Sequence, residues 1–150
     1  MAEWIEPIVD RTQEDVKFAL SKLQEWKLDN KLLTYDLKGC FNVSDLNRIE
    51  NNIRYLSEKL TEYYYFNHTA GNRTWNKEDI LYDEDIKIIR NNIDIIVSSY
   101  LFAGTPPLPE RLLTFEEVNR LEGNLYELKK TLDHMILSFR ECGTFECGEV

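Results

Sequence analysis

The fold of this chain is decided by residues 45–56, which read DLNRIENNIRYL. Apolar side chains recur there in steps of three and four, at Leu46, Ile49, Ile53 and Leu56. This spacing places them on one stripe of an α-helix, which must pack against a partner. The acidic residue that opens the stretch suits the positive end of a helix. The stretch therefore predicts an amphipathic helix with one buried face.

The same pattern returns twice along the chain. Residues 85–96 read DIKIIRNNIDII, and residues 117–128 read EVNRLEGNLYEL. Each copy keeps the opening acid, the apolar steps and one asparagine in the same place, which gives Asn52, Asn92 and Asn124. A weaker copy at 13–26 has a lysine in place of the asparagine. We interpret the pattern as an internal repeat, with units at 43–56, 83–96 and 115–128.

Start signals precede the copies. Thr12, Asn42 and Thr114 each stand three residues before an acidic residue, which is the arrangement of a capping box. Tyr82 occupies that place in the middle copy, so we expect its helix to begin at Asp83. No segment shows sustained strand alternation. We predict a single all-α domain of four helices, around residues 13–27, 43–66, 83–102 and 115–140.

The connectors between these helices are longer than bundle loops usually are. They carry aromatic residues, which we expect to pack back onto the helices: Trp4, Tyr35, Phe41 and Trp75. The repeated asparagines lie beside the apolar stripe, where leucine or alanine would favour a helix more. One interpretation is a repeated ligand contact. The interpretation that we favour is an amide that bonds the backbone of the preceding connector in each repeat.

Composition excludes several classes of function. The 150 residues carry 18 basic and 27 acidic side chains, for a net charge of -9. That balance argues against a nucleic-acid clamp, which needs a concentrated positive surface. No apolar run approaches the roughly 20 residues of a membrane span, and we expect no secretory leader. The three cysteines, Cys40, Cys142 and Cys147, fit synthesis in a reducing compartment, with the pairing of the last two left open.

Motifs for catalysis are missing from the sequence. It contains no nucleophile elbow, no phosphate-binding glycine loop, no dinucleotide fingerprint and no His-Glu-x-x-His helix. We therefore expect no catalytic residue, no cofactor and no metal site.

One aromatic group is a candidate contact for a partner or a sugar. It comprises Tyr63, Tyr64, Tyr65, Phe66 and Trp75. The alternative is that the connector covers this helix end through Trp75.

Three stretches around the first repeat carry a resemblance to a known family. They read DRTQEDV at 10–16, KG at 38–39 and NVSDLNRIENNI at 42–53. These stretches resemble a module encoded by phages and prophages of Firmicutes-type bacteria, whose members are generally described as minor structural or tail proteins. The resemblance spans residues 4 to about 130 and supplies no catalytic residues.

The resemblance implies a non-enzymatic structural protein of a phage tail or baseplate. It would be made in the bacterial cytoplasm, form homo-oligomers and contact other tail proteins in the virion. Two alternatives remain open at this point. One is a module that binds host glycans or a receptor at the tail tip, and the other is an acidic inhibitor that mimics DNA.

Overall fold

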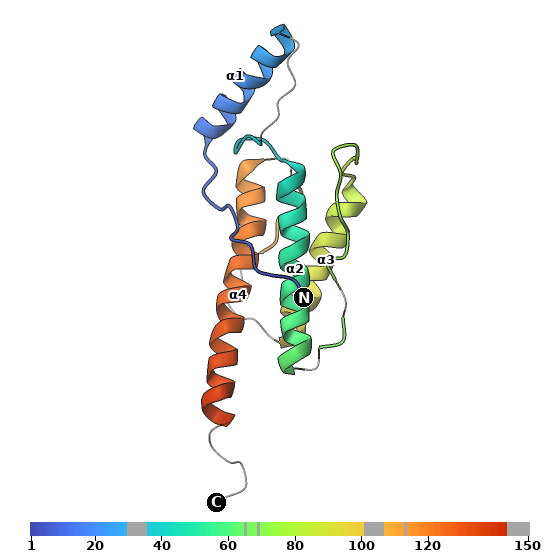
Figure 1. Ribbon diagram of the computed structural model, residues 1–150, viewed down its shortest axis with the longest axis vertical. Coiled ribbons are helices and arrows are strands. Elements are labelled where there is room, and N and C mark those ends of the chain that lie inside the picture. Colours follow the sequence, from blue (N-terminus) through green and yellow to red (C-terminus); the bar gives the residue numbers. More distant parts are fainter. Residues whose placement is uncertain (30–35, 65, 69, 101–106, 113, 144–150) are drawn as a thin grey trace, which may run out of the picture.

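The computed structural model describes residues 1–29, 36–64, 66–68, 70–100, 107–112 and 114–143. These residues form four helices and no strand, which confirms the predicted all-α class (Figure 1). The helices are α1 (Gln13–Asp29), α2 (Val43–Tyr64), α3 (Asp83–Tyr100) and α4 (Phe115–Gly143). Each helix begins at the predicted residue, whereas each ends two or three residues away from the prediction.

Carboxylates close the first turn of every helix. The backbone N–H of Thr12 donates to Asp15 Oδ2 at 2.9 Å, and that of Thr114 donates to Glu117 Oε2 at 2.9 Å. Tyr82 has no capping oxygen of its own within reach of the turn, yet its N–H donates to Asp85 Oδ2 at 2.9 Å. These backbone bonds lower the pKa of Asp15 and of Asp85. The feature that the helix starts share is therefore the acidic residue at the third helical position, not the residue that precedes the helix.

The three helices of the main repeat run in the same direction. In Figure 1, α2, α3 and α4 all descend, so the chain must return along the body between α2 and α3 and between α3 and α4. The connector before α3 makes this return as extended backbone, and the N-terminal segment runs along the body in the same way (Figure 1). This arrangement explains why the connectors are long.

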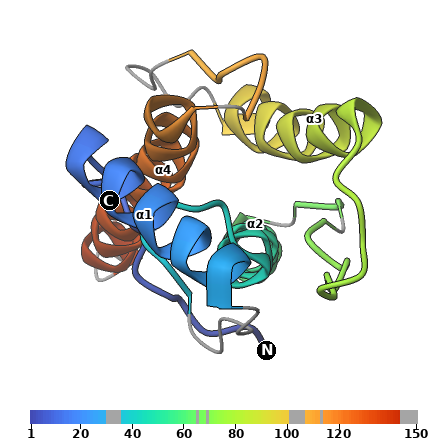
Figure 2. The same ribbon diagram turned by 90° about the horizontal axis from the view of Figure 1, so that it is seen from above.

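The core is built from the repeated apolar positions. Helix α2 packs against both α3 and α4 (Figure 2). The side chains that are buried most completely are Ile49, Ile53, Leu56, Leu60, Ile89, Ile93, Ile96, Leu121, Leu125, Leu128 and Leu132. Connector aromatics close the edges, as predicted for three of them: Trp75 is 2% exposed, Trp4 lies on Tyr55 with ring centroids 5.6 Å apart, and Phe41 packs against the core. Tyr35 lies outside the described residues.

Helix α1 stands apart from this core. It projects beyond the starts of α2 and α4 (Figure 1). Only Ala19 of its apolar residues is buried, whereas Phe18, Leu20 and Leu28 are 57%, 55% and 85% exposed. Its lower end is held by Gly39, whose position leaves no room for a Cβ against the backbone of Asp15. The weak copy of the repeat is therefore a helix that, among the described residues, buries little of its apolar surface.

Candidate functional site

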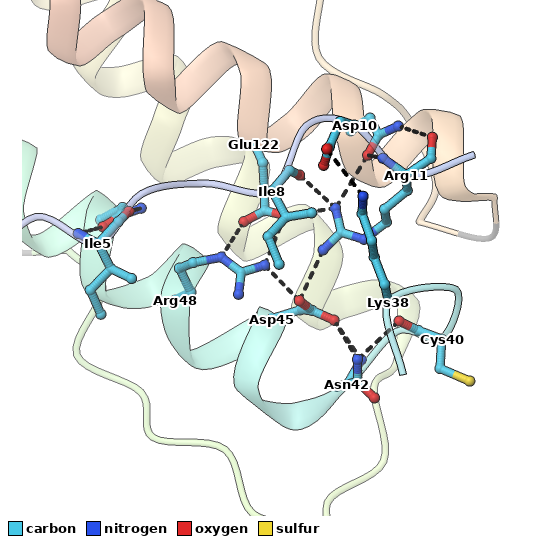
Figure 3. A network of polar contacts seen from close by, with 12 residues as sticks. Ile5, Ile8, Asp10, Arg11, Lys38, Cys40, Asn42, Asp45, Arg48 and Glu122 are labelled. Carbon is cyan, nitrogen blue, oxygen red and sulfur yellow. Dashed lines mark hydrogen bonds and ion pairs between the residues drawn. The ribbon is translucent and has the colours of Figure 1, made fainter. Parts of the chain in front are cut away.

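Two arginines and two carboxylates form a buried network between α2 and α4, which we call the closed site. The Arg11 guanidinium lies 2.9 Å from Asp45 Oδ1 and 2.8 Å from Glu122 Oε2. Arg48 lies 2.6 Å from Asp45 Oδ1 and 2.6 Å from Glu122 Oε1. Figure 3 shows both guanidinium groups converging on the two acids. The formal charge of the closed site is zero, and Glu122 is 0% exposed.

Neighbouring hydrogen bonds complete the closed site. Arg11 also donates to the carbonyl oxygen of Ile8 at 2.6 Å, and the backbone N–H of Asn42 donates to Asp45 Oδ2 at 2.8 Å. Burial alone would lower the pKa of Arg48, but its hydrogen bonds to Glu122 and Asp45 outweigh burial and raise that pKa. A buried charge network of this kind demands that every member be paired. The closed site meets that demand and joins the N-terminal segment, α2 and α4.

Asparagine side chains hold the returning segments by their backbone. Asn119 donates to the carbonyl oxygen of Arg11 at 2.9 Å and accepts from its N–H at 3.3 Å. Asn47 does the same with Trp75, at 3.0 and 2.7 Å, and Asn52 with Ile5, at 2.7 and 3.1 Å. One amide thus satisfies both polar groups of one residue in an extended segment.

The three asparagines singled out in the sequence do not share one role. Asn52 holds the backbone of Ile5, as the favoured interpretation expects, although Ile5 precedes α1 and not α2. Asn92 Oδ1 lies 3.3 Å from His68 Nε2. Asn124 is fully buried, and its amide has no hydrogen-bond partner among the described residues. Asn47 and Asn119, which match each other in the repeat, complete the set of backbone holders.

The predicted aromatic group is not gathered in one place. Tyr63 and Tyr64 are half-buried at the end of α2, Phe66 is buried, and Tyr65 lies outside the described residues. Trp75 is held by Asn47, and α2 rises about 1.5 Å per residue, so Trp75 lies roughly 24 Å along the helix from Tyr63. Its buried ring is covered by Arg73, whose guanidinium carbon lies 3.5 Å from the ring centroid. Trp75 therefore closes the core beside the start of α2 and does not cover the far end of that helix.

A second charged site lies between α2 and α3, and we call it the open site. Its charged members are Glu50 of α2, Asp85 of α3 and Arg73 of the connector, which pairs with Asp85. Together with Ile88 they line a cavity of about 280 Å³. Glu50 is only 4% exposed. Burial raises the pKa of Glu50, against the opposing effects of the Trp75 indole and the Arg73 charge.

The open site follows the plan of the closed site with two differences, one at each arginine. Counting from the acid that opens each copy, Asp85 corresponds to Asp45 and Glu50 corresponds to Glu122. Arg11 and Arg73 both come from a returning segment and both meet the acid at the start of a helix. Arg11 is itself the residue that Asn119 holds, and it also pairs with Glu122. In the open site Asn47 holds Trp75 instead, and Arg73 pairs with Asp85 alone. The position of Arg48 is occupied in α3 by Ile88.

Sequence reasoning missed both sites. The matched pairs Asn47-Arg48 and Asn119-Arg120 show in the sequence that these positions recur in the repeat. The sequence does not show that α4 packs against α2. Cys40 borders the closed site, where burial and then the charge of Asp45 raise its thiol pKa. Cys142 lies in a part of α4 whose side chains are not described, and Cys147 lies outside the described residues.

Comparisons with known proteins add no relative to this description. No protein-family model, no curated protein and no solved structure matches the chain. Within the described ranges, none of the helices has both the length and the apolar character needed to cross a membrane. The site residues are therefore interpreted on their own geometry.

Proposed function

We propose that this protein is a structural component of a phage tail or baseplate that contacts neighbouring subunits through its helices. The observation that carries the proposal is α1, a helix that projects from the body with large apolar side chains exposed on it. Monomeric soluble proteins rarely expose such groups together unless they meet a partner. The resemblance of residues 4 to about 130 to phage minor structural proteins gives the kind of assembly.

The construction of the body supports the same proposal. Returning segments are tied to helices by paired backbone hydrogen bonds at Asn47, Asn52 and Asn119, and the closed site locks the N-terminal segment between α2 and α4. Such a body keeps its shape while α1 is free to engage a neighbour. We assign no reaction to it, and its partners would be other tail proteins and further copies of itself.

Purified particles of the phage that encodes the protein provide the test. We expect mass spectrometry to detect the chain in the particles, and antibody labelling in negative-stain micrographs to place it on the tail. A variant with F18S, L20S and L28S should fold with an unchanged helical circular-dichroism signal but fail to enter the particle. Absence of the wild-type chain from intact particles would refute the proposal.

A further inference from the structure

The open site is one positive charge short of the closed site. In the closed site the carboxylates of Asp45 and Glu122 face the guanidinium groups of Arg11 and Arg48. In the open site Arg73 pairs with Asp85, Glu50 has no ion pair among the described residues, and Ile88 stands where the second arginine would be. The formal charge is therefore minus one, and the missing group is a guanidinium.

The space for that group is present. The lining of the cavity of about 280 Å³ includes the acids Glu50 and Asp85, the cation Arg73, and the side chains of Trp75, Ile88 and Asn92. The Glu50 side chain is only 4% exposed. Among the described residues, no lysine or arginine lies within ion-pair distance of its carboxylate. A buried carboxylate without a cation is costly, so a cationic ligand gains more here than at an exposed acid.

The surroundings of the cavity fit a protein partner better than a free cation. Trp75 and the exposed Ile88 line the cavity, and two further large residues just before α3, Ile80 and Tyr82, are exposed. An arginine that enters a pocket bordered by apolar and aromatic side chains is the usual composition of an interface hot spot. The occupant is therefore an arginine side chain carried by a folded surface.

This chain itself carries an exposed arginine at the repeat position of Arg48. Arg120 of α4 occupies the repeat position of Arg48. It is exposed and makes no ion pair within the described part of the chain. The glutamate position of α3 holds Arg90, so α3 offers Arg120 no carboxylate there. One copy of the protein thus has a vacant arginine position and another has an unused arginine.

We propose that the open site is a receptor for a guanidinium group, and that Arg120 of a second copy supplies it. The contact joins two different surfaces, so it leads to rings or open chains of subunits and not to a closed dimer. The inference rests on the proposed structural function and names the contact through which copies meet.

Sedimentation velocity over a range of concentrations tests the source of the arginine. Wild-type protein should self-associate, and E50Q and R120Q should each weaken association at least about 30-fold, because each leaves one charge of a buried pair alone. An equimolar mixture of E50Q and R120Q should regain one intact contact and form heterodimers. The matched controls are E84Q, an exposed acid of α3, and R111Q, an exposed arginine before α4; both should associate as wild type does.

A second measurement tests the receptor without any partner. I88R supplies the guanidinium from the chain itself, so it should raise the urea midpoint and abolish self-association. The gain should disappear in the double variant I88R with E50Q, and the control I80R should show no gain. An equal gain with and without Glu50 would overturn the guanidinium receptor.

Two results would overturn the assignment of the occupant. One is a wild-type chain that stays monomeric at the highest soluble concentration while I88R shows its Glu50-dependent gain. The other is association that E50Q and R120Q leave unchanged. Neither depends on whether the protein is found in phage particles, so failure of this proposal and failure of the proposed function are separate results.

Discussion

The closed site and the open site are two solutions to one packing problem. In both, an extended segment returns between two helices and is held by an asparagine, while its arginine meets the acid at the start of a helix. The closed site adds Arg48 and becomes neutral and fully buried. The open site has Ile88 instead and keeps a cavity beside a buried carboxyl. The presence of Arg48 and the pairing of Arg11 with both acids thus separate a structural lock from a potential receptor.

The three copies of the repeat share their buried apolar positions and differ in charge at the edge of the core. The apolar positions of α2, α3 and α4 are all buried, so a change there costs core packing. The position of Arg48, Ile88 and Arg120 lies at the edge of the core, and it carries a buried arginine, an exposed isoleucine and an exposed arginine. We therefore expect measured stability to depend on the closed site far more than on the open one.

The largest expected effect comes from removing one carboxylate from each site. E122Q should lower the free energy of unfolding by about 3–5 kcal/mol, because two buried guanidinium groups lose a partner. E50Q should change it by less than about 1 kcal/mol, since no cation pairs with that carboxyl. Urea unfolding at concentrations that keep the chain monomeric gives both values. Equal losses would show that the two sites do not differ as described.

A smaller loss is expected at the close approach of the connector to α2. Gly71 has a φ of 70°, and a Cβ there would overlap the backbone of Glu50 and Arg54. G71A should therefore cost at least about 2 kcal/mol through strain and displacement of the connector. The matched control is G123A on α4, where the nearest atom to a Cβ is Val9 Cγ1 at 4.0 Å. That variant should gain about 0.5–1 kcal/mol from helix propensity, and thermal unfolding of both would check the contrast.

The asparagine holders of the two sites should be similar in strength. N47A and N119A each leave a backbone N–H and a carbonyl without partners, at a cost of about 1–3 kcal/mol. Amide hydrogen exchange should speed up at Trp75 in the first variant and at Arg11 in the second. N91A changes an exposed asparagine of α3 and is the control. Faster exchange at both amides in either variant would mean that the segments are held together and not separately.

The smallest effect is a dependence on pH. The pKa of Glu50 is raised above 4.5 in the folded chain, so folding is penalised when the carboxyl is ionised and the penalty fades as pH falls. E50Q should accordingly be more stable than wild type at neutral pH, with the difference shrinking as pH falls toward 4.5. Asp85 has a lowered pKa, so D85N should behave in the opposite way and lose less stability at low pH than at neutral pH. Urea midpoints at several pH values distinguish these signs.

Much of the fold could be predicted from local patterns. The apolar steps and the opening acids gave all four helix starts, because both signals lie within one turn of each start. The helix ends were less accurate, since no comparable side-chain signal closes α2 at Tyr64 or α3 at Tyr100. The burial of Trp4, Phe41 and Trp75 also followed from the need of long connectors to pack.

The candidate sites could not be predicted in the same way. Arg11 and Glu122 meet only because α4 packs against α2 and the N-terminal segment crosses both helices. Nothing in the sequence near either residue specifies that meeting. The asparagines show the same limit: the repeat pointed to Asn52, Asn92 and Asn124, but the partners of Asn47 and Asn119 depend on which segment returns past them.

The chain leaves the body before α1 and rejoins it after α1 at nearly the same point. Lys38 Nζ lies 3.1 Å from Asp10 Oδ2, and Gly39 rests on the backbone of Asp15. The segment between Asp15 and Lys38 is therefore a loop whose two ends contact each other. Its length can change without moving α2, α3 or α4. That geometry makes residues 13–36 the natural place for insertions during evolution, and the site of choice for grafting a tag or a binding loop onto this scaffold.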